Sequence, residues 1–186
     1  MKKISIRSIS LTSLAVLVGA LLFSNIESAH AANLAVTTTV DELNSDGDCS
    51  LREAIRAANT DVAVDACTAG SGADVITLPA GTYTLTIAGA GEDAAATGDL
   101  DITDDLTING APAVSTIIDG GGIDRVLEVH PGATVQVNGV TVRNGNPGGN
   151  GGGIFNQGTL TLMESTVTNN TGASFGGGIK NFGVIF

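Results

Sequence analysis

The sequence predicts an all-β protein built as a parallel β-helix, a solenoid of short stacked strands, with one short capping α-helix near its N-terminus. A 25-residue repeat in the second half of the chain predicts the solenoid, because repeats of this length stack as successive circuits of a coil. Apolar and polar residues alternate inside the repeat, which indicates strands. The composition agrees, since 26 glycines and only 3% aromatic residues suit β-branched strands joined by sharp bends.

Residues 1–31 are predicted to be a secretory signal peptide. Basic residues begin the chain, a mostly apolar run follows from residue 9 to residue 23, and Ala29-His30-Ala31 offers the small residues that a signal peptidase reads. An uncleaved anchor is the alternative, but the run is too short for a stable membrane span. We therefore expect cleavage before Ala32, a secreted or cell-surface product, and no transmembrane segment after cleavage.

The mature chain is strongly acidic. It keeps five basic and eighteen acidic residues, which gives a formal charge of −13. So few Lys and Arg residues disfavour nucleic acid as a partner, because they cannot neutralise its phosphates. The partner that we expect is a surface or a carbohydrate.

A short amphipathic helix is predicted over residues 51–59. Ser50 and Glu53 have the S-x-x-E spacing of a capping box. An apolar stripe follows at helical spacing, formed by Leu51, Ala54, Ile55 and Ala58. Four polar residues are expected to face away from it: Arg52, Glu53, Arg56 and Asn59. We expect residues 32–73 to form an N-terminal cap region over the open end of the coils, and residues 74–186 to form the coils.

The chain has two cysteines, and their roles are linked. Cys49 stands just before the helix, where a thiol can become a nucleophile. A catalytic thiol needs a histidine partner, and His130 is the only histidine of the mature chain. An even number of cysteines in an exported chain instead predicts a disulfide between Cys49 and Cys67. Closing a loop of roughly 19 residues would stabilise the fold by about 3 kcal/mol.

Inside the repeat, GGGIFNQG (151–158) recurs as GGGIKNFG (176–183), and TVQVNGVTVRNGN (134–146) aligns with TLTLMESTVTNNT (159–171). The shift brings asparagines onto matching positions.

Asn144 aligns with Asn169, and Asn156 aligns with Asn181. We expect these pairs to stack as hydrogen-bonded ladders inside the bends. The alternative for Asn169-Asn170-Thr171 is a glycosylation acceptor.

Two acidic groups are candidates for chemistry. The first consists of Asp99, Asp101, Asp104 and Asp105, and the second of Asp119, Asp124 and Arg125. A glycoside hydrolase needs a pair of carboxylates, and a lyase needs a calcium cluster with a base. Turn positions explain most of these residues, so no catalytic residue is predicted. A weak structural calcium site at the first group is the one ion that we predict, and we expect no other cofactor.

The segment CSLREAI (49–55), preceded by VTTTVDELNSDGD and followed by DVITLPAGTYTL, resembles the CSLREA domain. That domain stands at the N-terminus of secreted bacterial proteins with right-handed parallel β-helices. The Gly-Gly-Gly-Ile repeats also resemble those of chlamydial polymorphic outer membrane proteins. The resemblance covers about residues 36–186. It implies a right-handed, pectin-lyase-like β-helix in an extracellular or cell-surface setting, and it brings no established catalytic motif.

These observations predict a structural or adhesive protein without catalysis. The alternative is a polysaccharide-active lyase or hydrolase, or the N-terminal part of one. A third possibility is a passenger segment that serves as cap and spacer in a larger exported protein. Family members continue through more coils, whereas this chain stops at NFGVIF within a strand. We therefore expect a truncated solenoid whose open last coil can associate with another copy.

Overall fold

The computed structural model describes residues 30–186, so almost all of the predicted signal peptide lies outside the described residues. One helix, α2 (Leu51–Thr60), and fourteen strands make up this part of the chain. The strands are β1 (Asn33–Ala35), β2 (Asp74–Leu78), β3 (Gly81–Thr84), β4 (Leu100–Ile102), β5 (Leu106–Gly110), β6 (Thr116–Asp119), β7 (Leu127–Val129), β8 (Thr134–Asn138), β9 (Thr141–Arg143), β10 (Ile154–Asn156), β11 (Thr159–Met163), β12 (Thr166–Thr168), β13 (Ile179–Asn181) and β14 (Val184–Ile185).

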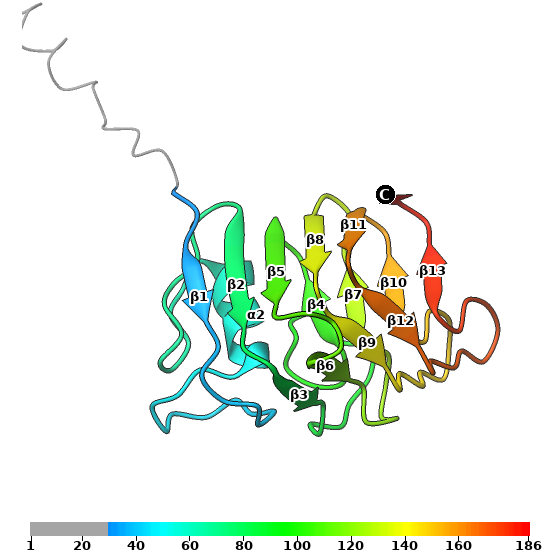
Figure 1. Ribbon diagram of the computed structural model, residues 1–186, viewed down its shortest axis with the longest axis horizontal. Helices are drawn as coiled ribbons and strands as arrows, with labels where there is room; N and C mark the ends of the chain where they lie inside the picture. The colour runs from blue at the N-terminus through cyan, green and yellow to red at the C-terminus, as the bar shows by residue number, and fades with distance from the viewer. Residues whose placement is uncertain (1–29) are drawn as a thin grey trace, which may run out of the picture.

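The strands form three parallel sheets (Figure 1). The six-stranded sheet has the order β1-β2-β5-β8-β11-β14. The β4 sheet has the order β13-β10-β7-β4, and the β3 sheet has the order β12-β9-β6-β3. Each circuit of the chain gives one strand to each sheet, beginning with β2, β3 and β4. The predicted all-β parallel solenoid with one short helix is therefore confirmed.

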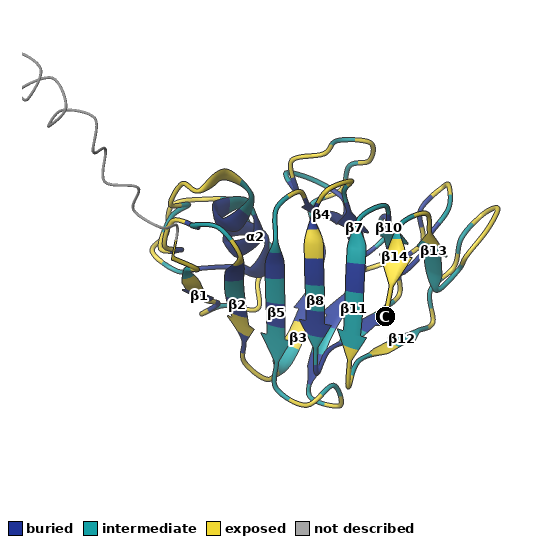
Figure 2. Cartoon of the chain, turned by 90° about the horizontal axis from the view of Figure 1, so that it is seen from above, coloured by how far each residue is buried: buried dark blue, intermediate teal, exposed yellow. Residues whose placement is uncertain are grey.

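Alternation of apolar and polar residues builds the core of the solenoid. In the six-stranded sheet, the inward positions stack Leu34 on Ile76, Ile76 on Ile108, and Ile108 on Val137. All four side chains are buried, whereas the residues between them are partly or fully exposed. Figure 2 shows the same alternation along β2, β5 and β8. Branched aliphatic side chains therefore fill the interior that a protein of this size often fills with aromatic rings.

The sequence repeat sets the strand register only in the last circuits. There Thr134 pairs with Thr159, and Ile154 pairs with Ile179, as the alignment of the repeats predicts. The earlier circuits are longer, since the chain runs from Asp74 to its register partner Leu106 before it completes one. The extra residues lie in the bends, where a loop can lengthen without changing the strand stack.

Asparagine and glycine make the sharp bend after β9. Asn144 has a φ of +58°, and its counterpart Asn169 one repeat later has a φ of +54°. Both adopt the left-handed conformation that asparagine tolerates. At Gly145, a Cβ atom would collide with the carbonyl oxygen of Gly152, so this bend has no space for a side chain.

Helix α2 lies at the N-terminal end of the solenoid, close to the predicted bounds. Its stripe of Leu51, Ala54, Ile55 and Ala58 is buried as predicted. The prediction that Arg52 and Glu53 face away from the core was wrong, because both are buried. Arg52 contacts loops remote from the helix, which the helical spacing does not reveal, whereas Glu53 is buried as part of the capping box and accepts from Ser50 N and Asn44 N.

The predicted cap region also contains strand β1. Asn33 pairs with Val75 and Ala35 with Thr77, so this strand extends the six-stranded sheet before the helix begins. Among the described residues, no helix has the length and apolar character needed to cross a membrane.

Candidate functional site

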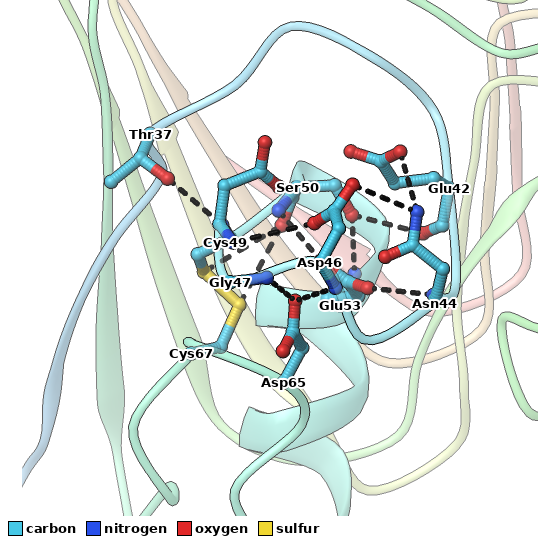
Figure 3. Close-up of a disulfide and its surroundings, with 11 residues drawn as sticks. Thr37, Glu42, Asn44, Asp46, Gly47, Cys49, Ser50, Glu53, Asp65 and Cys67 are labelled. Carbon is cyan, nitrogen blue, oxygen red and sulfur yellow. Dashed lines mark hydrogen bonds between the residues drawn. A yellow bond between two sulfur atoms is a disulfide. The ribbon is translucent and has the colours of Figure 1, made fainter.

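The start of helix α2 is closed by a capping box and a disulfide (Figure 3). Ser50 Oγ accepts a hydrogen bond from Glu53 N at 3.1 Å, and Glu53 Oε2 accepts one from Ser50 N at 3.0 Å. Cys49 and Cys67 form a disulfide with their Cα atoms 4.9 Å apart. A sulfur held in a disulfide is not a free thiolate, so the structure gives Cys49 no nucleophilic role.

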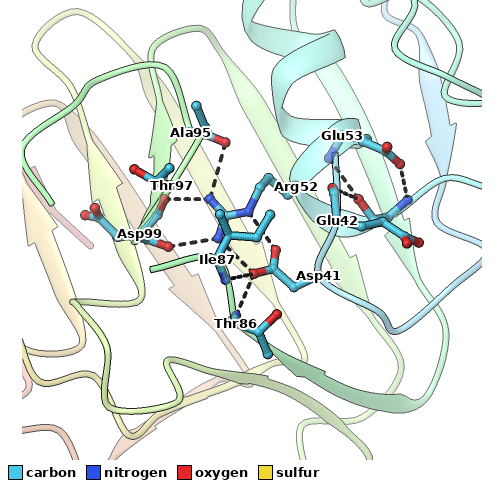
Figure 4. Close-up of polar contacts among 12 residues, drawn as sticks. Asp41, Glu42, Arg52, Glu53, Thr86, Ile87, Ala95, Thr97 and Asp99 are labelled. Carbon is cyan, nitrogen blue, oxygen red and sulfur yellow. Dashed lines mark hydrogen bonds and ion pairs between the residues drawn. The ribbon is translucent and has the colours of Figure 1, made fainter. Parts of the chain in front are cut away.

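Arg52 connects the helix to two distant loops (Figure 4). Its Nε donates to Asp41 Oδ1 at 2.6 Å, and its Nη2 donates to Asp41 Oδ2 at 3.2 Å. The same guanidinium donates to the carbonyl oxygens of Ala95, Gly98 and Asp99. The side chains of Arg52 and Asp41 are 0% and 4% exposed. This buried ion pair therefore joins the cap to the loop between β3 and β4.

The loop before the helix gathers carboxylates. Glu42, Asp46 and Asp48 place oxygen atoms within 4.8 Å of one another. Desolvation raises the pKa of Glu42, and the charges of Asp46 and Asp48 raise it further. Asn44 Nδ2 lies among them and donates to Glu42 at 2.8 Å and to Asp46 at 3.1 Å.

The spacing from Glu42 to Glu53 follows that of a calcium-binding loop, with Glu in place of the usual first Asp. In such loops the last Glu supplies two oxygen ligands. Here both oxygens of Glu53 already accept backbone N–H groups, from Asn44 and Ser50. The loop is therefore organised as a helix cap, and we assign it no ion.

A second carboxylate group lies on the outward side of the β4 sheet. Asp101 and Glu128 are register partners on β4 and β7, and Asp99 directly precedes β4. Oxygen atoms of these three residues lie within 4.8 Å of one another. They are only 0–8% exposed, so the group is buried despite its outward position. The exposed Asp93 brings one more carboxylate oxygen to the edge of the group, within 4.8 Å of Asp101 and His130.

Two basic side chains partner this carboxylate group. Arg125 Nε lies 2.5 Å from Asp99 Oδ2, and Arg125 Nη1 lies 2.9 Å from Glu128 Oε2. The first contact is an ion pair that is not aligned as a hydrogen bond. His130 Nε2 lies 3.1 Å from Asp101 Oδ1. One arginine and one histidine carry at most two positive charges, which do not match the charge of three ionised carboxylates.

Burial controls the protonation of this group. Burial raises the pKa of Asp99 to about 7, against the opposing effect of Arg125 and with support from neighbouring carboxylates. Burial also raises the pKa of Asp101, although the hydrogen bond from His130 lowers it. Asp99 therefore gains and loses its proton near neutral pH. Acid–base catalysts have such a pKa, but so do buried carboxyl groups with a purely structural role, so the pKa alone does not assign a function.

We expect Asp99 to make the stability of the fold depend on pH. Because its pKa is about 7 in the folded chain and 3.8 ordinarily, the folded state holds the proton more tightly. Its contribution to the free energy of unfolding is therefore complete below pH 4 and is lost as the pH rises through 7. Urea unfolding at pH 5 and pH 8 should show a smaller difference in Asp99→Asn than in the natural chain.

The exposed Glu164 provides the control, since Glu164→Gln removes the same charge in the turn between β11 and β12, outside the buried group. It should leave the difference between pH 5 and pH 8 unchanged. An equal pH dependence in Asp99→Asn and the natural chain would show that Asp99 is ionised throughout this range.

The structure divides the predicted calcium set. Asp99 and Asp101 lie with Glu128, whereas the other two residues serve the turn before β5. Asp104 Oδ1 accepts from Asp105 N at 2.7 Å, and Asp105 Oδ1 accepts from Thr134 N at 2.7 Å. Residues close in the sequence separate here because the chain bends between β4 and β5, which belong to different sheets. The four residues therefore do not form one group, which corrects the predicted set, and calcium at Asp99 and Asp101 stays a prediction.

The second predicted group is divided too. Arg125 joins Asp99, while Asp119 pairs with Arg143 at 2.8 Å on the outward side of the β3 sheet. Burial opposes ionisation of Asp119, but hydrogen bonds from Gly121 N, Arg143 and Asn144 outweigh it and lower its pKa. Asp124 is buried, and its charge acts on Asp99.

The asparagine pairs differ from each other. Asn156 Nδ2 donates to Asn181 Oδ1 at 2.6 Å, which is the contact expected of a ladder. Asn144 Nδ2 instead donates to Asp119 Oδ2 at 2.9 Å, while Asn169 is exposed at the matching bend. The two repeats share the backbone bend here rather than a side-chain contact. The predicted side-chain ladder is therefore found for Asn156 and Asn181 and not for Asn144 and Asn169, and glycosylation of Asn169 stays an untested alternative.

Several contacts of the β4 sheet could not be predicted from the sequence. Glu128 and His130 belong to the carboxylate group only because the pairing of β4 with β7 brings them to Asp101. An aromatic group in the last circuits was not predicted either. Phe155 and Phe182 pack edge to face at 5.6 Å, and Lys180 Nζ lies 4.7 Å from the Phe182 ring centre.

Comparison with known proteins adds no further information on this site, because no protein-family model, curated protein or solved structure matches the chain.

Proposed function

We propose that this chain is an exported protein with a structural or adhesive role outside the cell or at its surface, and that it catalyses no reaction. We infer that the solenoid is right-handed, because connections between parallel strands of one sheet are nearly always right-handed. Its three parallel sheets and the resemblance of residues 49–55 support a pectin-lyase-like β-helix with a CSLREA-type cap. The disulfide gives weak support for a compartment outside the cytoplasm. The partner that we propose is a carbohydrate surface.

The outward face of the six-stranded sheet carries the adhesive part of this proposal. Its two central rows hold ten residues and no charged side chain, although the protein is strongly acidic. One row is Asn33, Val75, Thr107, Gln136 and Thr161, and the other is Ala35, Thr77, Asn109, Asn138 and Met163.

Hydrogen bonds hold amides of this face in place, one between the strands β8 and β5 and one along β8 itself. Asn138 Nδ2 donates to Asn109 Oδ1 at 2.7 Å, and Gln136 Nε2 donates to Asn138 Oδ1 at 3.0 Å. Amides and hydroxyls both donate and accept hydrogen bonds, as sugar hydroxyls do. An ordered, uncharged face binds a neutral sugar polymer with a small loss of side-chain entropy.

The carboxylate group supports the absence of catalysis. Asp99, Asp101 and Glu128 are buried and already contact Arg125 or His130. A glycosidase needs carboxylates on both sides of a bound sugar, with space between them for the reacting atoms. Ionic contacts within the protein occupy that space here.

The alternative is a polysaccharide-active lyase or hydrolase, and one observation favours it. Asp99 has a pKa of about 7, the range in which a carboxyl transfers protons near neutral pH. This alternative needs the loop between β3 and β4 to open, because Ala95 N donates to Asp101 Oδ2 at 3.1 Å and covers that carboxylate.

Sedimentation with insoluble polysaccharides tests both proposals in one experiment. The mature chain is mixed with microcrystalline cellulose, with chitin and with cross-linked polygalacturonate, and the supernatant is assayed for reducing ends and unsaturated uronides. We expect binding to a neutral polymer without release of product. We expect the pair Thr107→Glu and Gln136→Glu to weaken binding about tenfold or more, because a carboxylate there loses its hydration without gaining a partner.

The matched control is the pair Thr82→Glu and Thr166→Glu on exposed positions of the β3 sheet, which adds the same charge to another face. It should bind as the natural chain does. Equal weakening by both pairs would contradict the assignment of the face. Product release that Asp99→Asn abolishes would favour the enzyme instead.

A further inference from the structure

Asp74, the first residue of β2, is a buried carboxylate with only backbone donors around it. Its side chain accepts from Ser71 N at 2.9 and 3.1 Å, and its Oδ1 accepts from Ala32 N at 2.8 Å. The residue is 1% exposed. Within residues 30–186, no Lys, Arg or His side chain forms an ion pair with it. A carboxylate this deeply buried ordinarily has a cation nearby.

Ala32 is the point at which the chain joins the fold. Its side chain is partly buried against the core, whereas His30 and Ala31 are exposed. Its carbonyl oxygen accepts from Val75 N at 2.9 Å, one residue before β1 begins. Two contacts therefore hold the nitrogen of Ala32 beside Asp74: its own hydrogen bond to the carboxylate, and the backbone hydrogen bond from Val75 N to the Ala32 carbonyl oxygen.

We propose that cleavage of the bond between Ala31 and Ala32 turns this nitrogen into an α-ammonium that pairs with Asp74. The inference rests on the proposed export, since it needs a peptidase that removes the leader. Hydrolysis consumes one water, leaves a carboxylate on Ala31, and frees the amine of Ala32, which is largely protonated at pH 7. Removal of the leader thus supplies the cation that the buried carboxylate lacks.

The position of the cleaved bond decides whether the charge reaches Asp74. An amide N–H already bonds Asp74 in the uncleaved chain, and cleavage makes that contact charge-assisted and about twice as strong. Cleavage one residue earlier would place the ammonium on the exposed Ala31 and leave a neutral amide at Asp74. Cleavage one residue later would remove the contacting nitrogen altogether.

The first measurement is the N-terminal residue of the exported product, read by mass spectrometry of the intact protein. We expect Ala32 to be residue one. A product that begins at another residue, or one that keeps the leader, overturns the inference. An unexported chain would count against the proposed function itself.

The second measurement is a double-mutant cycle on purified protein. Each chain is produced as a fusion, and proteolytic removal of the fusion partner leaves a chosen first residue. Chains that start at Ala32 and at Ala31 are compared, each with Asp74 and with Asp74→Asn. We expect the unfolding equilibrium constant in urea to be about tenfold lower for the Ala32 chain than for the Ala31 chain. In Asp74→Asn this difference should vanish.

The control is Asp105→Asn, which removes a carboxylate that also accepts a backbone N–H, in this case from Thr134. It should keep the full difference between the two starting residues. If Asp74→Asn does not fold, equal stability of the Ala32 and Ala31 chains in the natural background still overturns the ion pair. That result would leave export intact when the product begins at Ala32.

Discussion

Replacement of Arg52 by alanine should lower the free energy of unfolding by about 3–5 kcal/mol, the cost of leaving one partner of a buried ion pair alone. Asp41 would keep its buried charge and lose both guanidinium hydrogen bonds. Three carbonyl oxygens of the loop between β3 and β4 would lose a donor as well. Urea unfolding followed by circular dichroism measures the loss.

Arg56 is the matched control, because it stands one turn further along the same helix and is partly exposed. Arg56→Ala should cost less than about 1 kcal/mol, as most surface substitutions do. Arg52→Lys should fall between the two, since it keeps the charge but loses the planar fork that contacts Asp41 and the carbonyl oxygens. If Arg52→Ala costs no more than Arg56→Ala, the ion pair does not hold the cap.

The burial of Arg52 could not be predicted from the sequence. The helical spacing placed Leu51, Ala54, Ile55 and Ala58 correctly in the core, because a helical period contains that information. The same period assigned Arg52 to the solvent side. Its partners lie in the loop before the helix and in the loop between β3 and β4, and neither loop has a periodic pattern. Local patterns predict which face of a helix is apolar, but long-range contacts decide which polar residue is buried.

Strand pairing was likewise predicted only where a local sequence pattern contains the information. The sequence repeat predicted the pairing of β8 with β11 and of β10 with β13, since both partners carry the same pattern. Strand β1 was missed, because so short a strand cannot establish alternation. The carboxylate group was predicted only in part. Glu128 lies a full circuit beyond Asp101, and the irregular early circuits concealed that they are register partners.

Loss of the disulfide should lower the free energy of unfolding by about 3 kcal/mol. Cys49 and Cys67 are 18 residues apart, and the chain-entropy estimate for a loop of this length is about 3 kcal/mol. Both residues are buried, so the double substitution Cys49→Ala and Cys67→Ala also removes packing around the helix start. Urea unfolding of this variant, compared with the oxidised natural chain, gives the difference.

The reduced natural chain separates these two contributions, because it lacks the cross-link but keeps the sulfur atoms in place. It should lose about the same 3 kcal/mol if the cross-link acts through the unfolded state, and an unchanged urea midpoint after reduction would contradict that. The loop keeps other contacts when the bond is cut, since Val64 and Cys67 exchange backbone hydrogen bonds and Ala66 N donates to Asp48 O.

The disulfide and Arg52 both hold the cap against the first circuit. When one of them is lost and the cap opens, the other has less left to stabilise, so the combined variant should lose less than the sum of the two.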